Sequence, residues 1–288
     1  MTEALSLLFN LSVLIFVLTS MFGMGLSLTL KQVFAPMRNV SLVLRALAAN
    51  FILSPLLAFA LAKIIGLDQQ LATGLFILGV AAGAPLLAKF AELAKGDLAF
   101  TLGLMVLLMV VTIIYAPLVL PLLMPDVQID VWGMIRSLVL TMLLPLAAGL
   151  FIKARYESLA ESLSPYMSQA SSLTLMMQLV LGLFLTVGDL LGVIGTGAIL
   201  AALLFLAGNM VFGWLLGGPG RDTRVVVTVG TAQRNVSAAM LIVVQNFSEP
   251  QVLLMVLTAA AVMLVGSTLV AGELGKRSQA EAPAGESA

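Results

Sequence analysis

The chain has 288 residues and a formal net charge of zero, with 61% hydrophobic and 10% charged residues. Soluble globular domains are about 45–50% apolar, so this composition, with a mean hydropathy of +1.13, excludes an ordinary water-soluble domain and predicts a polytopic membrane protein. The balanced charge indicates no nucleic-acid partner. Because the chain lacks both cysteine and histidine, thiol chemistry and the commonest zinc ligands are absent, and we expect no metal and no cofactor.

Apolar segments long enough to cross a bilayer follow one another along the chain, separated by short linkers. Nine such spans are predicted, with limits near 5–29, 39–66, 70–94, 98–123, 131–154, 168–191, 195–217, 224–247 and 250–272. Together they form one all-α transmembrane domain, residues 1–272. The remaining residues, 273–288, are rich in Ala, Glu, Ser and Gly, a composition that predicts a disordered cytoplasmic tail.

Basic residues predict the orientation of the spans. Lysine and arginine occur in alternate linkers, all on one face of the predicted bundle: Lys31, Arg38, Lys95, Lys153, Arg155, Arg221, Arg224, Lys276 and Arg277. The opposite linkers carry acidic residues and no basic residue between spans: Asp68, Asp126, Asp130, Asp189 and Glu249. The positive-inside rule therefore predicts that the N-terminus lies outside and the C-terminus lies in the cytoplasm. We expect an integral protein of a bacterial inner (plasma) membrane.

Arg234 lies in the middle of the predicted span 224–247. A charged side chain at this depth costs roughly 2.5–3.5 kcal/mol in insertion measurements, so such residues face the protein interior and mark a substrate or ion path. Its neighbours Gly230, Gln233 and Asn235 make the segment unusually polar. The pattern predicts a helix that is interrupted where it lines a cavity.

The predicted span 70–94 has the same character, because Gly83-Ala84-Pro85 breaks its apolar run and Lys89 and Glu92 follow. Two interrupted segments in corresponding halves of a membrane chain indicate a transporter binding site. Two interpretations of Lys89 are open. It pairs with Glu92, three residues later on the same helical face, or it is a buried ammonium that loads and releases a proton during transport.

Several segments of the chain are similar to motifs of the bile acid:sodium symporter family of secondary transporters. In the family's order they are Met21–Thr29, Ala49–Pro55, Leu93–Ala99, Leu144–Leu150, Gly208-Asn209 and Gln233-Arg234-Asn235. The resemblance implies two inverted repeats of five helices, here without the first helix, and two broken helices that cross. It also implies a core domain of helices at about 39–123 and 195–272 and a panel domain at about 5–29 and 131–191.

The chain departs from the family at the positions where the resemblance implies sodium ligands. Aligned without gaps, Leu87-Ala88 replaces a serine–asparagine pair, Thr101 and Met105 take two hydroxyl positions, Gly230 replaces a glutamate, and Arg234 and Asn50 each replace a glutamine. Sodium, like other hard cations, needs several oxygen donors to replace its water. Neither site is therefore expected to bind sodium well.

The resulting prediction is a sodium-independent secondary active transporter that moves a small organic anion across the bilayer by elevator-type alternating access. In one interpretation Arg234 and Lys89 are fixed cations in place of the sodium ions; in the other, one or both bind the anionic substrate. Proton coupling and exchange are both open, and a conventional sodium-coupled symporter is the alternative. The expected site residues are Arg234, Asn235, Gln233, Lys89, Asn50, Thr101, Gly83 and Gly230.

Two other classes of protein fit the sequence less well. An intramembrane enzyme needs a nucleophile with its base, or a metal cluster, at mid-depth, and the chain has no histidine, no cysteine and no paired aspartates inside its spans. A membrane scaffold gives no reason for the cost of burying Arg234. We therefore expect a transporter and no enzymatic activity.

Overall fold

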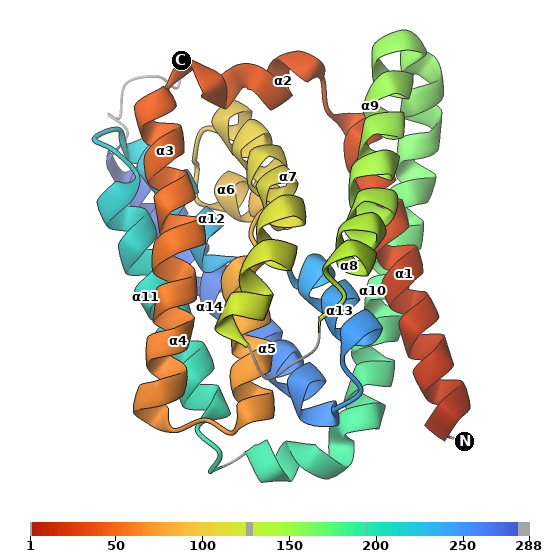
Figure 1. Ribbon diagram of the computed structural model, residues 1–288. Coiled ribbons are helices and arrows are strands. Elements are labelled where there is room, and N and C mark those ends of the chain that lie inside the picture. The colour runs from red at the N-terminus through yellow and green to blue at the C-terminus, as the bar shows by residue number, and fades with distance from the viewer. Residues whose placement is uncertain (1, 125–128, 194, 282–288) are drawn as a thin grey trace.

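The computed structural model describes residues 2–124, 129–193 and 195–281 (Figure 1), and every regular element in these ranges is helical. In chain order the elements are α1 (Thr2–Ser27), α2 (Leu30–Phe34), the 3-10 helix η1 (Ala35–Arg38), α3 (Val40–Ala48), the π-helix η2 (Ala49–Leu53), α4 (Ser54–Ile65), α5 (Gln69–Val80), α6 (Leu87–Leu93), α7 (Leu98–Leu123), α8 (Val131–Leu138), the π-helix η3 (Val139–Leu143), α9 (Leu144–Arg155), α10 (Glu157–Val193), α11 (Ala198–Leu216), α12 (Arg221–Ala232), α13 (Val236–Asn246) and α14 (Pro250–Glu281). The all-α prediction is confirmed for the described chain.

Seven helical stretches of the described residues are long and apolar enough to cross a membrane. They are Ala4–Ser27, Val40–Ile65, Leu98–Leu122, Val131–Arg155, Ala198–Leu216, Arg221–Asn246 and Pro250–Ser278. The predicted span 70–94 is divided into α5 and α6, and the predicted span 168–191 lies within α10, which is not among the seven. The polytopic class is therefore confirmed, whereas the count of nine spans remains a prediction.

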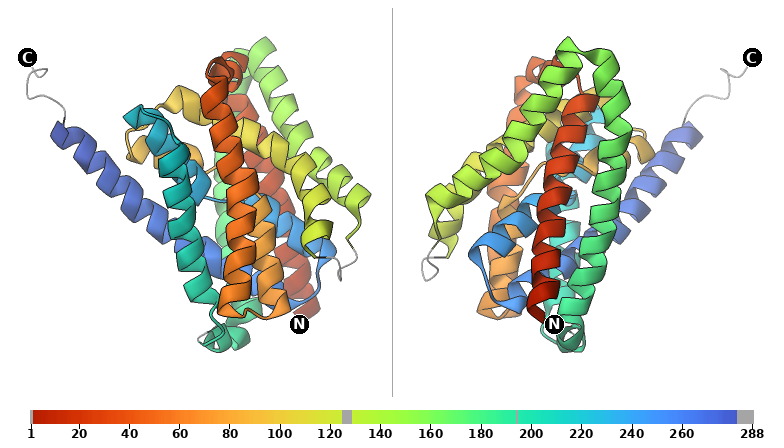
Figure 2. Two further views of the ribbon diagram at one scale, coloured as in Figure 1. Left: turned by 60° about the vertical axis from the view of Figure 1, so that its left-hand side comes forward. Right: turned by 90° about the vertical axis from the view of Figure 1, so that its right-hand side faces the viewer.

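The most polar span occupies the interior of the molecule. Arg221–Asn246 has the lowest mean hydropathy of the seven, 1.2, and 94% of its most apolar window is buried, against 28% for Ala4–Ser27. Lipid cannot satisfy polar groups, so α12 and α13 are surrounded by other helices. On one side of the molecule α1, α9 and α10 pack against one another, and the right-hand view of Figure 2 shows this side.

Two long helices widen into a π-helical turn just before a proline: η2 before Pro55, and η3 before Pro145. Proline has no N–H, and its ring clashes with the carbonyl four residues earlier. In η2 the N–H of Ser54 therefore bonds to Ala49 O, five residues back. The carbonyl of Asn50 is left without a helical partner, since its α-helical donor, Ser54, is engaged and its π-helical donor would be Pro55.

The structure also differs from the prediction in two connecting regions. The linker between the first two spans contains α2 and η1, which the sequence pattern did not reveal. At the other end of the chain α14 continues to Glu281. The prediction of a disordered tail from residue 273 is therefore wrong for residues 273–281, which are helical. Residues 282–288 lie outside the described residues, and so does Asp126.

Candidate functional site at the two helix breaks

Both predicted interruptions are present, and Asn235 joins them. The chain leaves α5 after Val80 and enters α6 at Leu87, and it leaves α12 after Ala232 and enters α13 at Val236. The backbone N–H of Asn235 donates to Ala81 O (3.0 Å), and its Nδ2 donates to Gly83 O (3.0 Å). Its Oδ1 accepts from the N–H of Ala238 (3.0 Å), so one asparagine both caps α13 and binds the other break.

Gly83 and Thr112 fix the first break against α7. Gly83 has φ +80°, and a Cβ at this position would lie 2.3 Å from Met109 N and 2.7 Å from Met105 O, so only glycine allows this approach of the two backbones. Nearby, the hydroxyl of Thr112 accepts from Ala82 N–H (2.9 Å) and donates to Ala82 O (3.1 Å). One threonine side chain thus satisfies both backbone groups of a residue that has left the helix.

Arg234 is completely buried, and its guanidinium donates five hydrogen bonds. Nε donates to Leu78 O (3.0 Å), Nη1 to Asn50 Oδ1 (2.7 Å) and Thr231 O (3.4 Å), and Nη2 to Gly79 O (2.8 Å) and Asn50 O (3.3 Å). A guanidinium has five N–H donors. The whole donor set of Arg234 is therefore engaged by protein oxygens.

The charge of Arg234 is balanced by dipoles rather than by a carboxylate. Within the described chain it is the one charged side chain that is fully buried, and all its acceptors are carbonyl or amide oxygens. Leu78 and Gly79 lie in the last turn of α5, and Thr231 lies in the last turn of α12. Helix C-termini carry partial negative charge, so two half-helices and the widened turn η2 together make a cation site that Arg234 fills.

Asn50 connects this cation site to its surroundings. Its Nδ2 donates to Ala46 O (2.9 Å) and to Thr231 Oγ1 (3.1 Å), and both its oxygens accept from Arg234. The hydroxyl of Tyr115, on α7, donates to Phe51 O in the same π-helical turn. The helix-widening effect of Pro55 thus supplies the acceptors that a regular α-helix would not expose.

Gln233 lies beside this network on the same break. Its side chain is buried, and its Oε1 accepts from the hydroxyl of Ser267 on α14 (3.2 Å). The second break is therefore bonded on both flanks, through Asn235 to the first break and through Gln233 to α14.

The sequence profile of the family described as "Sodium Bile acid symporter family" matches residues 13–214, which is more than half of the chain. The chain belongs to the sodium bile acid symporter family. Together with the seven long apolar helices, this membership shows an integral membrane transport protein, and the family suggests an organic anion as the substrate. No curated protein matches the chain. The match ends before α12, so it does not include Arg234.

At positions 87 and 230, where the resemblance predicts that oxygen ligands are replaced, apolar atoms fill the space. Leu87 is fully buried, and a Cβ added to Gly230 would lie 3.2 Å from Leu87 Cδ2. Leu87 begins α6, and Gly230 lies in the last turns of α12. The side chain of Leu87 therefore packs on Gly230.

Besides Gly230, two of the expected site residues lie outside the Arg234 network. Thr101 is buried on α7, but its hydroxyl donates to Asp97 O (2.6 Å) in its own helix. Lys89 is exposed on α6, and the described residues contain no ion pair between it and Glu92. Neither interpretation of Lys89, the pair or the buried ammonium, is found in this conformation.

Besides Thr231, whose hydroxyl accepts from Asn50 Nδ2, three hydroxyl-bearing residues of the site were absent from the expected set: Thr112, Tyr115 and Ser267. Each is a single hydroxyl within a strongly apolar span, where a bond to its own helix backbone is the ordinary expectation. A signal for Thr112 was present, since it lies eleven residues, about three helical turns, after Thr101 and so on the same face of α7. The partners of Tyr115 and Ser267 depend on tertiary packing that spacing does not reveal.

Proposed function

We propose that this protein is a sodium-independent secondary active transporter that carries a small organic anion by elevator-type alternating access. In this proposal Arg234 permanently supplies the positive charge that a sodium ion supplies at the aligned position in sodium-coupled relatives. The observation that carries the proposal is the complete engagement of the Arg234 guanidinium by five hydrogen bonds to uncharged oxygens.

The same hydrogen bonds favour a fixed cation over a direct substrate ligand. Bidentate hydrogen bonding to a carboxylate or sulfonate requires two free, parallel N–H donors. In Arg234 every donor already has an acceptor, and the side chain is fully buried. A substrate would have to break bonds to the end of α5 or to Asn50 in order to reach it.

Loss of sodium binding is further supported by the contact between Leu87 and Gly230. Sodium needs several oxygen donors in place of its hydration shell, and this contact offers only carbon atoms. Lys89 is exposed, so the proposal assigns the fixed charge to Arg234 alone. The coupling ion is then a proton or a second anion moving in the opposite direction.

The elevator motion is supported by how the Arg234 network ties its elements together. One guanidinium bonds to η2, α5 and α12, and Asn235 and Gln233 add α13 and α14 to the same connected unit. On the proposal this unit is the core domain, which moves as one body. The panel domain is the group of α1, α8, α9 and α10, of which α1, α9 and α10 pack side by side (Figure 2).

Uptake into proteoliposomes tests the proposal. The purified protein is supplied with a panel of organic anions, each with a sodium gradient, a pH gradient, an internal pool of the same anion, or none of these. We expect at least one anion to accumulate to the same level in sodium buffer and in choline buffer. This accumulation is driven by the pH gradient or by the internal pool. Accumulation that requires sodium would overturn the coupling mechanism and favour a conventional symporter.

A further inference from the structure

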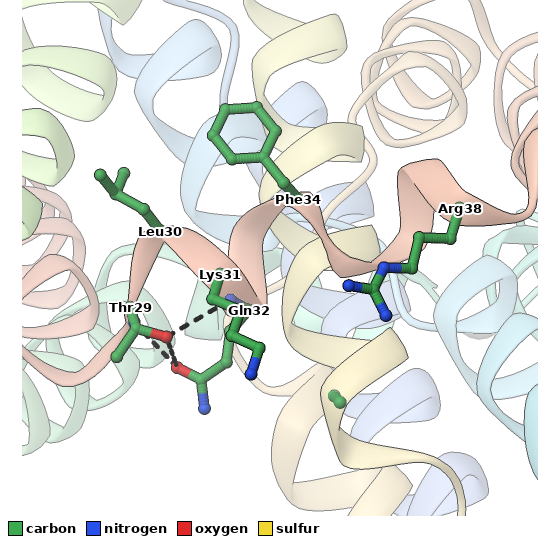
Figure 3. A pocket seen from close by; sticks show the side chains of 7 residues that line it. Thr29, Leu30, Lys31, Gln32, Phe34 and Arg38 are labelled. Atoms are coloured by element: carbon green, nitrogen blue, oxygen red, sulfur yellow. Dashed lines mark hydrogen bonds between the residues drawn. The ribbon is translucent and has the colours of Figure 1, made fainter.

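The segment between α1 and α3 carries a pocket with both charged and apolar walls, apart from the two helix breaks. The pocket has a volume of about 680 Å³ and is lined by Thr29, Leu30, Lys31, Gln32, Phe34, Arg38 and Ala99 (Figure 3). Here α2 and η1 cross one end of the molecule beside α7 (Figure 1). None of these residues bonds to Arg234, Asn235 or Asn50, and the pocket takes no part in the proposed transport site.

The position of the segment in the chain places the pocket at a membrane surface. It connects two apolar stretches, Ala4–Ser27 and Val40–Ile65, each of which is long enough to cross the bilayer. A short connection between two such stretches lies at the level of the lipid headgroups. The pocket therefore faces a layer in which phosphate groups and the first part of the acyl chains are both within reach.

Local contacts hold the segment in place. Pro36 is buried, and a Cβ added to Gly103 of α7 would lie 2.2 Å from Pro36 Cδ and 2.6 Å from Gln32 O. Thr29 and Gln32 form a reciprocal cap, in which Gln32 Oε1 accepts from Thr29 N–H (2.8 Å) and Thr29 Oγ1 accepts from Gln32 N–H (3.3 Å). The pocket is thus preformed against α7.

Among the residues that the structure describes, the cations of the pocket have no carboxylate partner. Lys31 and Arg38 are exposed, and neither forms an ion pair within the described chain. Asp97, the acidic residue nearest to Ala99 in the sequence, accepts from Phe100 N–H (3.0 Å) and caps α7. The amide nitrogen of Gln32 adds a further donor, because the cap uses only its oxygen.

The apolar walls decide between a soluble anion and a lipid. Leu30 and Phe34 line the same pocket and are 51% and 61% exposed. Figure 3 shows them projecting from one side of the segment, whereas Gln32 and Arg38 project from the other. Exposed apolar side chains next to unpaired cations are typical of segments that bind anionic membrane surfaces. We propose that this pocket binds the headgroup of an acidic phospholipid, with Lys31 and Arg38 on its phosphate and Leu30 and Phe34 against its acyl chains.

Native mass spectrometry of the intact protein, with phosphatidylglycerol and phosphatidylcholine at equal concentration, tests this assignment. We expect one phosphatidylglycerol to be retained preferentially. A basic residue near an anionic surface contributes roughly a five-fold change in affinity, so the double variant Lys31→Gln/Arg38→Gln is expected to bind this lipid about 30-fold more weakly. The matched control, Lys276→Gln/Arg277→Gln, removes the same charge from α14 and is expected to keep the lipid.

Two further variants distinguish lipid binding from binding of a soluble anion and from a general folding defect. Phe34→Ser is expected to weaken phosphatidylglycerol binding although all cations remain, and Gly103→Ala is expected to weaken it by displacing Pro36. The assignment is overturned if the Lys31/Arg38 variant keeps its lipid preference or if both double variants lose it equally. It is also overturned if Phe34→Ser binds normally, or if glycerol phosphate at equal concentration displaces the lipid.

Discussion

A guanidinium buried without a carboxylate is stable only if its surroundings replace both its hydration and its counter-charge. Arg234 meets both conditions through carbonyl oxygens, which accept its five N–H groups and sum to a partial negative charge at two helix ends. Lysine would supply the charge but has only three donors, at a single point. The geometry therefore accounts for arginine at this position.

Substitution of Arg234 is expected to lower stability in a graded manner. Hydrogen bonds to charged groups contribute about 1.5–3 kcal/mol each, so Arg234→Gln should cost about 3 kcal/mol or more, and Arg234→Lys should cost less. Thermal unfolding of the purified protein measures this order. Arg45→Gln removes an exposed positive charge from α3 and should change the unfolding temperature little; an equal loss in both variants would contradict the role assigned to Arg234.

Gly83 provides a second test at the scale of one residue. Gly83→Ala places a methyl group 2.3 Å from Met109 N at a φ of +80°, so the first break must shift and both stability and uptake should fall sharply. Gly272→Ala is the matched control, because a Cβ there meets no atom within 4 Å and alanine favours the helix by up to about 1 kcal/mol. Normal uptake by Gly83→Ala would show that the close contact with α7 is dispensable.

Individual residues of the site differ in how far their positions could be predicted from the sequence. The energetic cost of exposing Arg234 to lipid made its burial in the protein interior predictable, and the glycine and amide residues around positions 83 and 233 predicted the breaks. Asn50, whose side-chain and backbone oxygens accept from Arg234, was among the expected site residues. The other acceptors are the carbonyls of Leu78, Gly79 and Thr231, which were not predictable because backbone carbonyls are not encoded by residue type. Lys89 was interpreted through its neighbour Glu92, yet its side chain is exposed, since α6 turns that face outward.

At the scale of the element, the widened turn η2 connects a proline to the cation site. Pro55 cannot donate to the Asn50 carbonyl, and that carbonyl accepts from Arg234 instead. A proline within a span ordinarily indicates only a kink, whereas the shift to hydrogen bonds that span five residues depends on how neighbouring helices pack. The limits of most long helices, in contrast, follow closely from the apolar runs, because length and hydropathy determine them. The exceptions are α10, which begins at Glu157, and α14, which continues to Glu281, because both extend through polar sequence beyond the apolar run.

Pro55→Ala tests this connection. Alanine restores the missing N–H, so α3 and α4 are expected to relax into one regular α-helix and withdraw the Asn50 carbonyl from Arg234. We expect uptake and the unfolding temperature to fall together. Pro145→Ala makes the same change after η3, which has no bond to the Arg234 network, and is expected to leave the unfolding temperature closer to that of the unchanged protein. The same loss of uptake and of unfolding temperature in both variants would show that the site does not depend on η2.

At the scale of the whole molecule, the proposed elevator motion predicts that a cross-link between core and panel stops transport. The chain has no cysteine, so introduced pairs react alone. A Cβ at Gly182 of α10 would lie 3.2 Å from Leu257 Cδ1 of α14, and Gly182→Cys/Leu257→Cys is therefore expected to lose uptake when bridged by mercury(II) and to regain it with a thiol reductant.

A pair within the panel serves as the control for this cross-link. A Cβ at Gly23 of α1 would lie 3.1 Å from Met167 Cβ of α10, so Gly23→Cys/Met167→Cys also places two sulfurs together. On the proposal both helices move together, and bridging them should leave uptake unchanged. Full transport by the bridged Gly182/Leu257 pair would rule out a sliding motion between these two groups of helices.

The interior position of α12 and α13 also has a consequence for biosynthesis. Their stretch has the lowest hydropathy of the seven, 1.2, so the isolated segment should enter a bilayer poorly in a glycosylation-mapping assay, whereas Leu98–Leu122, at 2.6, should enter readily. Asn50, Leu78 and Gly79 all precede Arg234 in the chain, and they are therefore translated first. When Arg234 emerges from the ribosome, the segments that carry most of its hydrogen-bond acceptors have therefore already been synthesised and can already lie within the membrane.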